Sequence, residues 1–86
     1  MIKLTRHVKN NLKLYKITKK DIEDVIRYGK IRAMERNKHI VMKEIKGKFE
    51  NMPLKVIYTV ENEDEIIITV YPLRKNYKGG IDESKL

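Results

Sequence analysis

The sequence contains no cysteine, no tryptophan and no glutamine. The absence of cysteine excludes disulfides, thiolate metal sites and a cysteine nucleophile. Long apolar runs are also missing. No stretch approaches the length of a membrane-spanning helix, and the first residues lack the apolar segment of a signal peptide. We therefore expect a cytoplasmic protein that has no association with a membrane.

Several motifs that mark enzymes are absent as well. There is no glycine-rich phosphate loop, no paired zinc-ligand motif and no serine nucleophile elbow. The two histidines, His7 and His39, stand more than thirty positions apart, which is a weak signal for a metal site. We expect no metal and no cofactor. What remains is chemistry that cationic, imidazole and phenol groups can perform without either.

Positive charge is the main compositional feature of this 86-residue chain, which is long enough for one small domain. Its net charge is +8 and its pI is near 9.7. Residues 1–30 carry nine Lys/Arg against three acids, residues 31–60 carry seven against three, and residues 61–86 carry four against six. Excess cations favour polyanionic partners. The alternative is ordinary solubility charge in a lysine-rich protein.

Two helices are predicted at the N-terminal end. Thr5 is a suitable N-cap for a helix whose apolar stripe is Val8, Leu12 and Tyr15, at the spacing of one helical face. A second helix is predicted to start after Thr18 and to stop at Gly29. The side of the first helix opposite its apolar stripe is basic and carries Arg6, Lys9, Lys13 and Lys16.

From residue 31 the apolar pattern alternates, which is typical of strands. Strands are predicted over 31–36 and 39–45, with a turn at Asn37 and Lys38. A hairpin follows over 54–71, with an acidic turn at 61–65, and Pro72 ends it. We expect an α+β fold in which two N-terminal helices pack on a three- to four-stranded antiparallel sheet. Residues 1–75 would form the single domain and residues 76–86 a flexible tail.

The cationic and phenolic residues suit metal-free RNA cleavage, in which the 2′-hydroxyl attacks its own phosphate. In this hypothesis His7 acts as general base or acid, Tyr71 orients or donates a proton, and Arg74 and Lys55 hold the scissile phosphate. The predicted RNA-binding lysines are Lys9, Lys13, Lys16, Lys43, Lys55 and Lys75. The alternatives are a packing role for His7 and Tyr71 and an exposed strand-end charge for Arg74.

Short segments resemble the family of domains of unknown function called DUF4258. They are Leu4-Thr5-Arg6-His7, the Ile-Thr pair at 17–18, residues 25–30, residues 54–58 and residues 68–72, so the resemblance covers about residues 4–75. It implies helices on one side of an antiparallel sheet, as in the RelE and BrnT ribonuclease toxins, and functional positions at His7, Thr69, Tyr71 and Arg74. Thr69 is included among the RNA-binding candidates on this ground.

This sequence has Tyr15 and Lys16 where the family commonly has an arginine-glycine pair. If that arginine binds phosphate, its absence here either removes catalysis or leaves Arg74 and Lys16 to substitute for it. The predicted function is that of a toxin-like RNA-binding protein, with metal-independent endoribonuclease activity in a toxin-antitoxin system. The expected partners are RNA, including ribosome-bound mRNA, and an acidic antitoxin protein. The alternatives are a non-catalytic module that binds nucleic acid or protein, and an accessory domain without RNA function.

Overall fold

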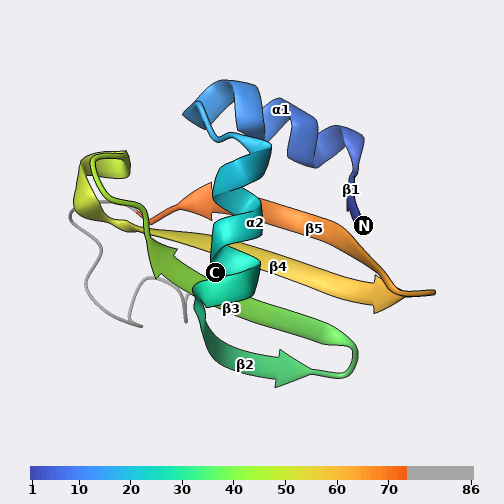
Figure 1. Ribbon diagram of the computed structural model, residues 1–86. Helices are drawn as coiled ribbons and strands as arrows, with labels where there is room; N and C mark the ends of the chain where they lie inside the picture. The colour runs from blue at the N-terminus through green and yellow to red at the C-terminus, as the bar shows by residue number, and fades with distance from the viewer. Residues whose placement is uncertain (74–86) are drawn as a thin grey trace, which may run out of the picture.

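Five strands and two α-helices form one layer of helices over one sheet in the computed structural model, which describes residues 1–73 (Figure 1). The elements are β1 (Ile2–Leu4), α1 (Arg6–Tyr15), α2 (Lys19–Tyr28), β2 (Lys30–Glu35), β3 (Lys38–Glu44), a 3-10 turn (Phe49–Asn51), β4 (Pro53–Glu61) and β5 (Asp64–Pro72). Arg74, Lys75 and the predicted tail, residues 76–86, lie outside the described residues.

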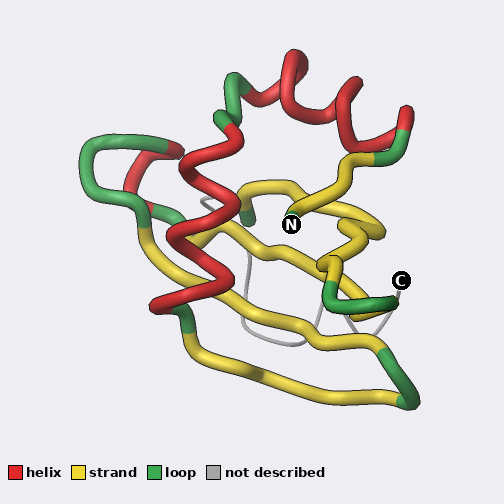
Figure 2. The backbone as a smooth tube through the Cα atoms, turned by 45° about the vertical axis from the view of Figure 1, so that its right-hand side comes forward, coloured by secondary structure: helices red, strands yellow, loops and turns green. Residues whose placement is uncertain are grey.

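The sheet is mixed and has five strands in the order β1-β5-β4-β3-β2 within residues 1–73. β1 runs parallel to β5, whereas every other neighbouring pair is antiparallel. The expected three- to four-stranded antiparallel sheet was therefore wrong in strand number and in direction. A strand of three residues is too short to show an alternating pattern, and its partner lies about sixty positions later in the chain. Figure 2 shows β1 as the short yellow segment at the N-terminus.

Both predicted helices are confirmed, and side chains cap both of them. The Thr5 hydroxyl accepts a hydrogen bond from the Val8 amide at the start of α1. At the start of α2 the Thr18 hydroxyl accepts from the Asp21 amide, and the Asp21 carboxylate accepts from the Thr18 amide. These reciprocal bonds satisfy amide groups that have no partner within the helix. The caps therefore fix where each helix begins.

The core lies between the two helices and one face of the sheet. Val8 of α1 and Ile22 and Val25 of α2 are fully buried, and so are Val56 and Val70 on the sheet. The other buried apolar residues are Ile17, Val41, Ile45, Leu54 and Ile67. α1 packs on β5, whereas α2 crosses β3 and β4 (Figure 1). No helix among the described residues is long and apolar enough to cross a membrane.

The β4–β5 hairpin is tighter than predicted and contains a bulge. Its turn is Asn62 and Glu63 alone, both at positive φ, rather than the five residues of the predicted loop. Ile57 pairs with Thr69 and the next residue of β4 pairs with Ile67, so Ile68 is an extra residue in β5. The bulge shifts the alternation along β5, so Ile67 is buried in the core and Ile68 is only half-buried.

Candidate nucleic-acid interface

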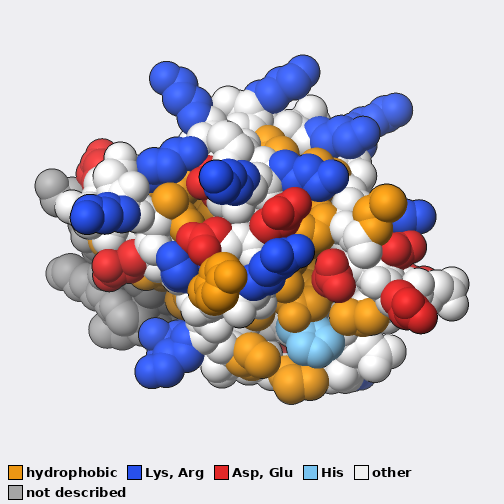
Figure 3. All heavy atoms as spheres, viewed as in Figure 1, with side chains coloured by type: hydrophobic (Ala, Val, Ile, Leu, Met, Phe, Trp, Pro, Cys, Tyr) orange, Lys and Arg blue, Asp and Glu red, His pale blue; other side chains and the backbone are white. Residues whose placement is uncertain are grey.

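Six exposed cations follow one another along α1 and into the first turn of α2. We call the set the α1 cationic surface; its members are Arg6, Lys9, Lys13, Lys16, Lys19 and Lys20. The first acidic residue of the chain is Asp21, so none lies within α1. None of the six cations forms an ion pair with any residue in the range 1–73. Figure 3 shows Lys and Arg side chains projecting from the top of the molecule, over α1.

α1 also covers a stretch of β5 that β1 is too short to reach. Within residues 1–73, β1 pairs with β5 only as far as Ile67, and no strand pairs with the following residues of β5 on that side. The Asn11 side-chain amide donates a hydrogen bond of 3.1 Å to the Val70 carbonyl at this edge. One helical turn earlier, His7 Nε2 lies 3.4 Å from Thr69 Oγ1. His7 and Asn11 thus share the side of α1 that faces β5.

Thr69, Tyr71 and Lys55 share the face of the sheet that points away from the helices. Thr69 pairs with Ile57 and Tyr71 pairs with Lys55, and the residues alternating with them are buried under the helices. Lys55 Nζ lies 5.7 Å from the centre of the Tyr71 ring, which is a cation–π distance. The structure therefore brings four of the predicted residues, His7 included, to one end of β5.

Lys55 is 4 % exposed, although it was predicted to hold a phosphate. A phosphodiester reaches an ammonium group only where solvent also reaches it. Contact between Lys55 and RNA would therefore require a rearrangement of this face. Thr69 and Tyr71 are half-buried, and His7 is exposed. The accessible part of the cluster is His7 with the Thr69 hydroxyl.

Lys43 lies apart from this cluster. It pairs across the strands with Leu54, whose side chain is buried under the helices, so Lys43 is on the helix face of the sheet. Its ammonium forms a 2.8 Å ion pair with Asp24 of α2. Lys9, Lys13 and Lys16 belong to the α1 cationic surface. Arg74 and Lys75 lie beyond the described residues.

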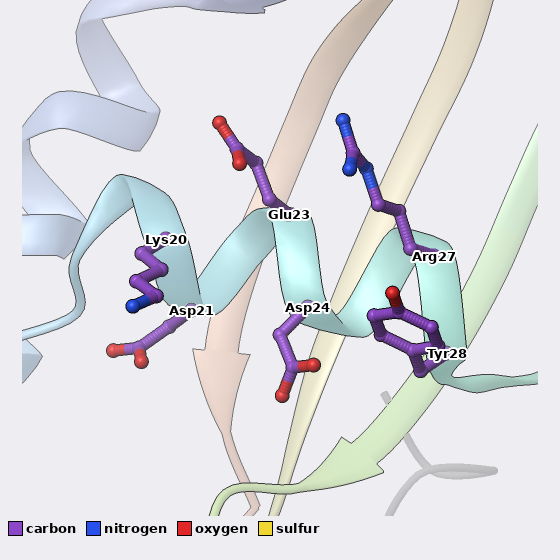
Figure 4. A pocket seen from close by; sticks show the side chains of 6 residues that line it. All are labelled: Lys20, Asp21, Glu23, Asp24, Arg27 and Tyr28. Atoms are coloured by element: carbon purple, nitrogen blue, oxygen red, sulfur yellow. The ribbon is translucent and has the colours of Figure 1, made fainter.

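A pocket beside α2 contains two aspartates whose contacts hold the helix in place (Figure 4). It is lined by Lys20, Asp21, Glu23, Asp24, Arg27 and Tyr28. Asp21 accepts a 2.6 Å hydrogen bond from Lys48, and Asp24 pairs with Lys43. Burial by itself would raise the pKa of Asp21, but the bonds from Lys48 and Thr18 outweigh it and lower that pKa below its ordinary 3.8. Both aspartates tie α2 to the sheet side of the molecule.

Among residues 1–73, no group of three or more His, Asp or Glu side chains is placed to hold a metal ion. Asn11, Lys19 and Lys20 were not predicted to be functional, and Arg6 was placed only on the basic side of the first helix. The spacing of four residues between His7 and Asn11 was the available signal for Asn11. For the cations, it was the absence of any acid from the first twenty residues.

Residues 4–72 match the model of the domain of unknown function DUF4258. No curated protein and no solved structure matches the chain. The comparisons give no relation to the RelE or BrnT toxins, so the resemblance holds for the family alone. The match covers most of the chain and includes both helices and four of the five strands of residues 1–73. The chain therefore belongs to the DUF4258 family.

Proposed function

We propose that this protein binds single-stranded RNA through the α1 cationic surface. The observation that carries the proposal is a row of six exposed cations with no acid between them in the sequence and no ion pair to the rest of residues 1–73. Cations already held by carboxylates must break those pairs before they bind phosphate, whereas these need not. Contacts of this kind are electrostatic and carry little sequence information.

The salt dependence of binding tests the surface. Four phosphate contacts predict that log K falls with log salt at a slope of about −3, since single strands give about −0.7 per contact. Charge reversal of Lys13 should weaken binding by about tenfold or more. The matched control is Lys46→Glu, which makes the same change in net charge on an exposed loop after β3.

A flat salt dependence would remove the proposal. Equal losses in Lys13→Glu and Lys46→Glu would show that net charge matters and that α1 is not the binding site. Circular dichroism of both variants checks that the fold is kept. Both side chains are exposed, so neither substitution removes core packing.

A second candidate function, metal-free RNA cleavage, is favoured by the contact between His7 and Thr69. His7 Nε2 is exposed, lies beside a hydroxyl and adjoins the α1 cationic surface. An imidazole there can take the proton of a 2′-hydroxyl as its oxygen attacks the neighbouring phosphorus, or return a proton to the departing 5′-oxygen. The nearby cations would offset charge that grows on the phosphate. Such an activity suits a toxin whose acidic antitoxin covers α1.

His7→Gln separates cleavage from binding. Loss of a general acid or base should slow cleavage by about a hundredfold or more, while RNA affinity and melting temperature stay close to wild type. His39→Gln is the control, because His39 lies on β3 and stacks on Tyr58. The assay contains a chelator. Wild-type protein that binds RNA and leaves it intact would reduce the function to binding, and full-rate cleavage by His7→Gln would remove His7 from the chemistry.

A further inference from the structure

The rows of apolar side chains under the helices continue past the helical layer to β2. One row crosses the sheet from Val70 through Val56 and Val41 to Ile31. Val70, Val56 and Val41 are at most 1 % exposed, whereas Ile31 is 56 % exposed. The helices cover β5, β4 and β3 but not the side chains of β2. The last apolar position of this row therefore faces solvent.

A second row behaves in the same way. It runs from Ile67 through Tyr58 and His39 to Met34. Ile67 is fully buried, and the His39 and Tyr58 rings stack with centroids 4.8 Å apart. His39 Nδ1 is buried without a hydrogen-bond partner in the described residues, whereas the His39 and Tyr58 side chains as a whole are half-buried. Met34 beyond it is 61 % exposed.

A bulge brings these two exposed side chains to the same face. Ile31 pairs with Val41 and Ala33 with Ile40, so Arg32 is an extra residue in β2. Without it, Ile31 and Met34, three positions apart, would point to opposite faces. Figure 3 shows hydrophobic side chains around a histidine on this part of the surface, over β2, β3 and β4. The bulge thus gathers one apolar strip along β2.

β2 is also an open edge of the sheet. It is the last strand in the order, and all six of its residues are exposed. Its outer backbone groups face no other strand in the described part of the chain. An edge of this kind pairs readily with an added extended segment.

The net charge of β2 and the turn after it indicates which kind of segment would bind there. Residues 30–38 carry four cations and one acid, a net charge of +3, and none of the five is in an ion pair within residues 1–73. A second copy would set +3 against +3, and a lysine and a bulge on an edge strand oppose self-association. An acidic segment would instead find complementary charge, free backbone groups and an apolar strip. RNA would contact only the cations and would leave the free backbone groups and the apolar strip uncovered.

We propose that β2 is the docking edge for an extended acidic segment of another protein, which adds a sixth strand to the sheet and covers Ile31 and Met34 with its apolar side chains. The site does not depend on RNA binding. It lies at the opposite edge of the sheet from β1, whereas α1 packs on β5 (Figure 1). The two surfaces can therefore be occupied at once.

The probe is a capped seven-residue peptide that alternates glutamate and valine. One control peptide replaces every glutamate with lysine. The other keeps all the side chains and carries N-methyl groups on alternate residues, so that one of its edges cannot pair. We expect each control to bind at least tenfold more weakly than the glutamate peptide. Met34→Ser should weaken binding of the glutamate peptide about fivefold or more, and Lys13→Glu should leave it within twofold.

Four results would overturn the proposal. The first is absence of binding at millimolar peptide, and the second is equal binding of the N-methylated peptide. The third is a loss of binding in Lys13→Glu but not in Met34→Ser, which would place the peptide on α1. The fourth is a different occupant of β2, seen either as a dimer that Met34→Ser dissociates or as RNA affinity that falls in Arg32→Glu and not in Lys13→Glu. Met34 is mostly exposed, so Met34→Ser retains the core, and its melting curve checks this.

Discussion

Gly29 lies where the end of α2 passes closest to β3. A Cβ atom at this position would clash with the Val25 carbonyl oxygen and would lie 2.7 Å from Val41 Cγ1. Its φ of −75° is open to any residue, so space and not backbone freedom demands glycine here. The sequence pattern placed the helix stop at Gly29 but did not show this close approach.

We expect Gly29→Ala to destabilise the domain by about 1–3 kcal/mol, the usual cost of overpacking. Urea denaturation measures it. Gly47→Ala is the comparison, because Gly47 is at φ +77° in open space and an alanine there incurs only backbone strain of about 1 kcal/mol. A Gly29→Ala variant as stable as wild type would mean that α2 and β3 are not so closely packed.

Asp21 should make stability depend on pH. Its pKa is lowered in the folded protein, because the bonds from Lys48 and Thr18 outweigh the effect of burial. The carboxylate therefore contributes stability that is fully present above the unfolded pKa of about 3.8 and is lost as the pH falls through the lower folded value. We expect Asp21→Asn to cost about 1–2 kcal/mol at pH 7.

The same substitution should cost much less at pH 2, where the wild-type carboxyl is increasingly protonated. Urea denaturation of both proteins at pH 7 and pH 2 makes the comparison. A Lys48→Met variant tests the partner, because loss of the ammonium should remove part of the same pH dependence. If Asp21→Asn lowered the free energy of unfolding equally at both pH values, the ionised form would not be the stabilising one.

Among the secondary-structure elements, α1 has a second task besides carrying cations: it closes the edge of β5 that β1 leaves open. Asn11 supplies the donor for the Val70 carbonyl. We expect Asn11→Ala to cost about 1 kcal/mol and to speed amide hydrogen exchange at the end of β5. Asn10→Ala is a matched control, since Asn10 is exposed and has no such bond among the described residues. Equal effects from the two alanines would mean that the edge is closed by packing alone.

Helices were predictable here because their caps and apolar stripes are local signals. Thr5 and Thr18 stand where the pattern placed them, and the alternation of Leu54, Lys55 and Val56 gave β4 its faces. Two kinds of feature were not predictable. β1 is defined by a partner about sixty residues away, and the bulge at Ile68 depends on how two strands pair. Neither leaves a trace in a short window of sequence.

The candidate site divides in the same way. The basic side of α1 was visible from helical spacing, whereas the approach of His7 to Thr69 needed the fold. The alternation in β4 predicted that Lys55 points away from the core, but it did not predict that this side chain is buried. Lys43 looked like a free cation, because its partner Asp24 comes from another element. A period gives the face of a side chain, and tertiary contacts decide what that side chain meets.

At the scale of the whole molecule, the distance between the two proposed binding surfaces is larger than the length over which salt screens charges. Three strand spacings separate β5 from β2, which is about 14 Å, and α1 lies on the β5 side. The Debye length at 0.15 M salt is about 8 Å. We expect saturating acidic peptide to change RNA affinity by less than about threefold. A larger loss, measured by fluorescence anisotropy with labelled RNA, would show that the two ligands share a surface.

The parallel pairing of β1 with β5 also orders events during synthesis. Residues 2–4 are translated before every other strand of residues 1–73, yet their partners at 65–67 follow about sixty residues later, which takes about 3–12 s at ordinary elongation rates. Through that interval α1 has no β5 to cover, and its basic side belongs to a nascent chain without a finished sheet. Within residues 1–73, the last strand to be made is therefore the one that pairs with the first, and a truncated product that lacks β5 would leave β1 without its partner.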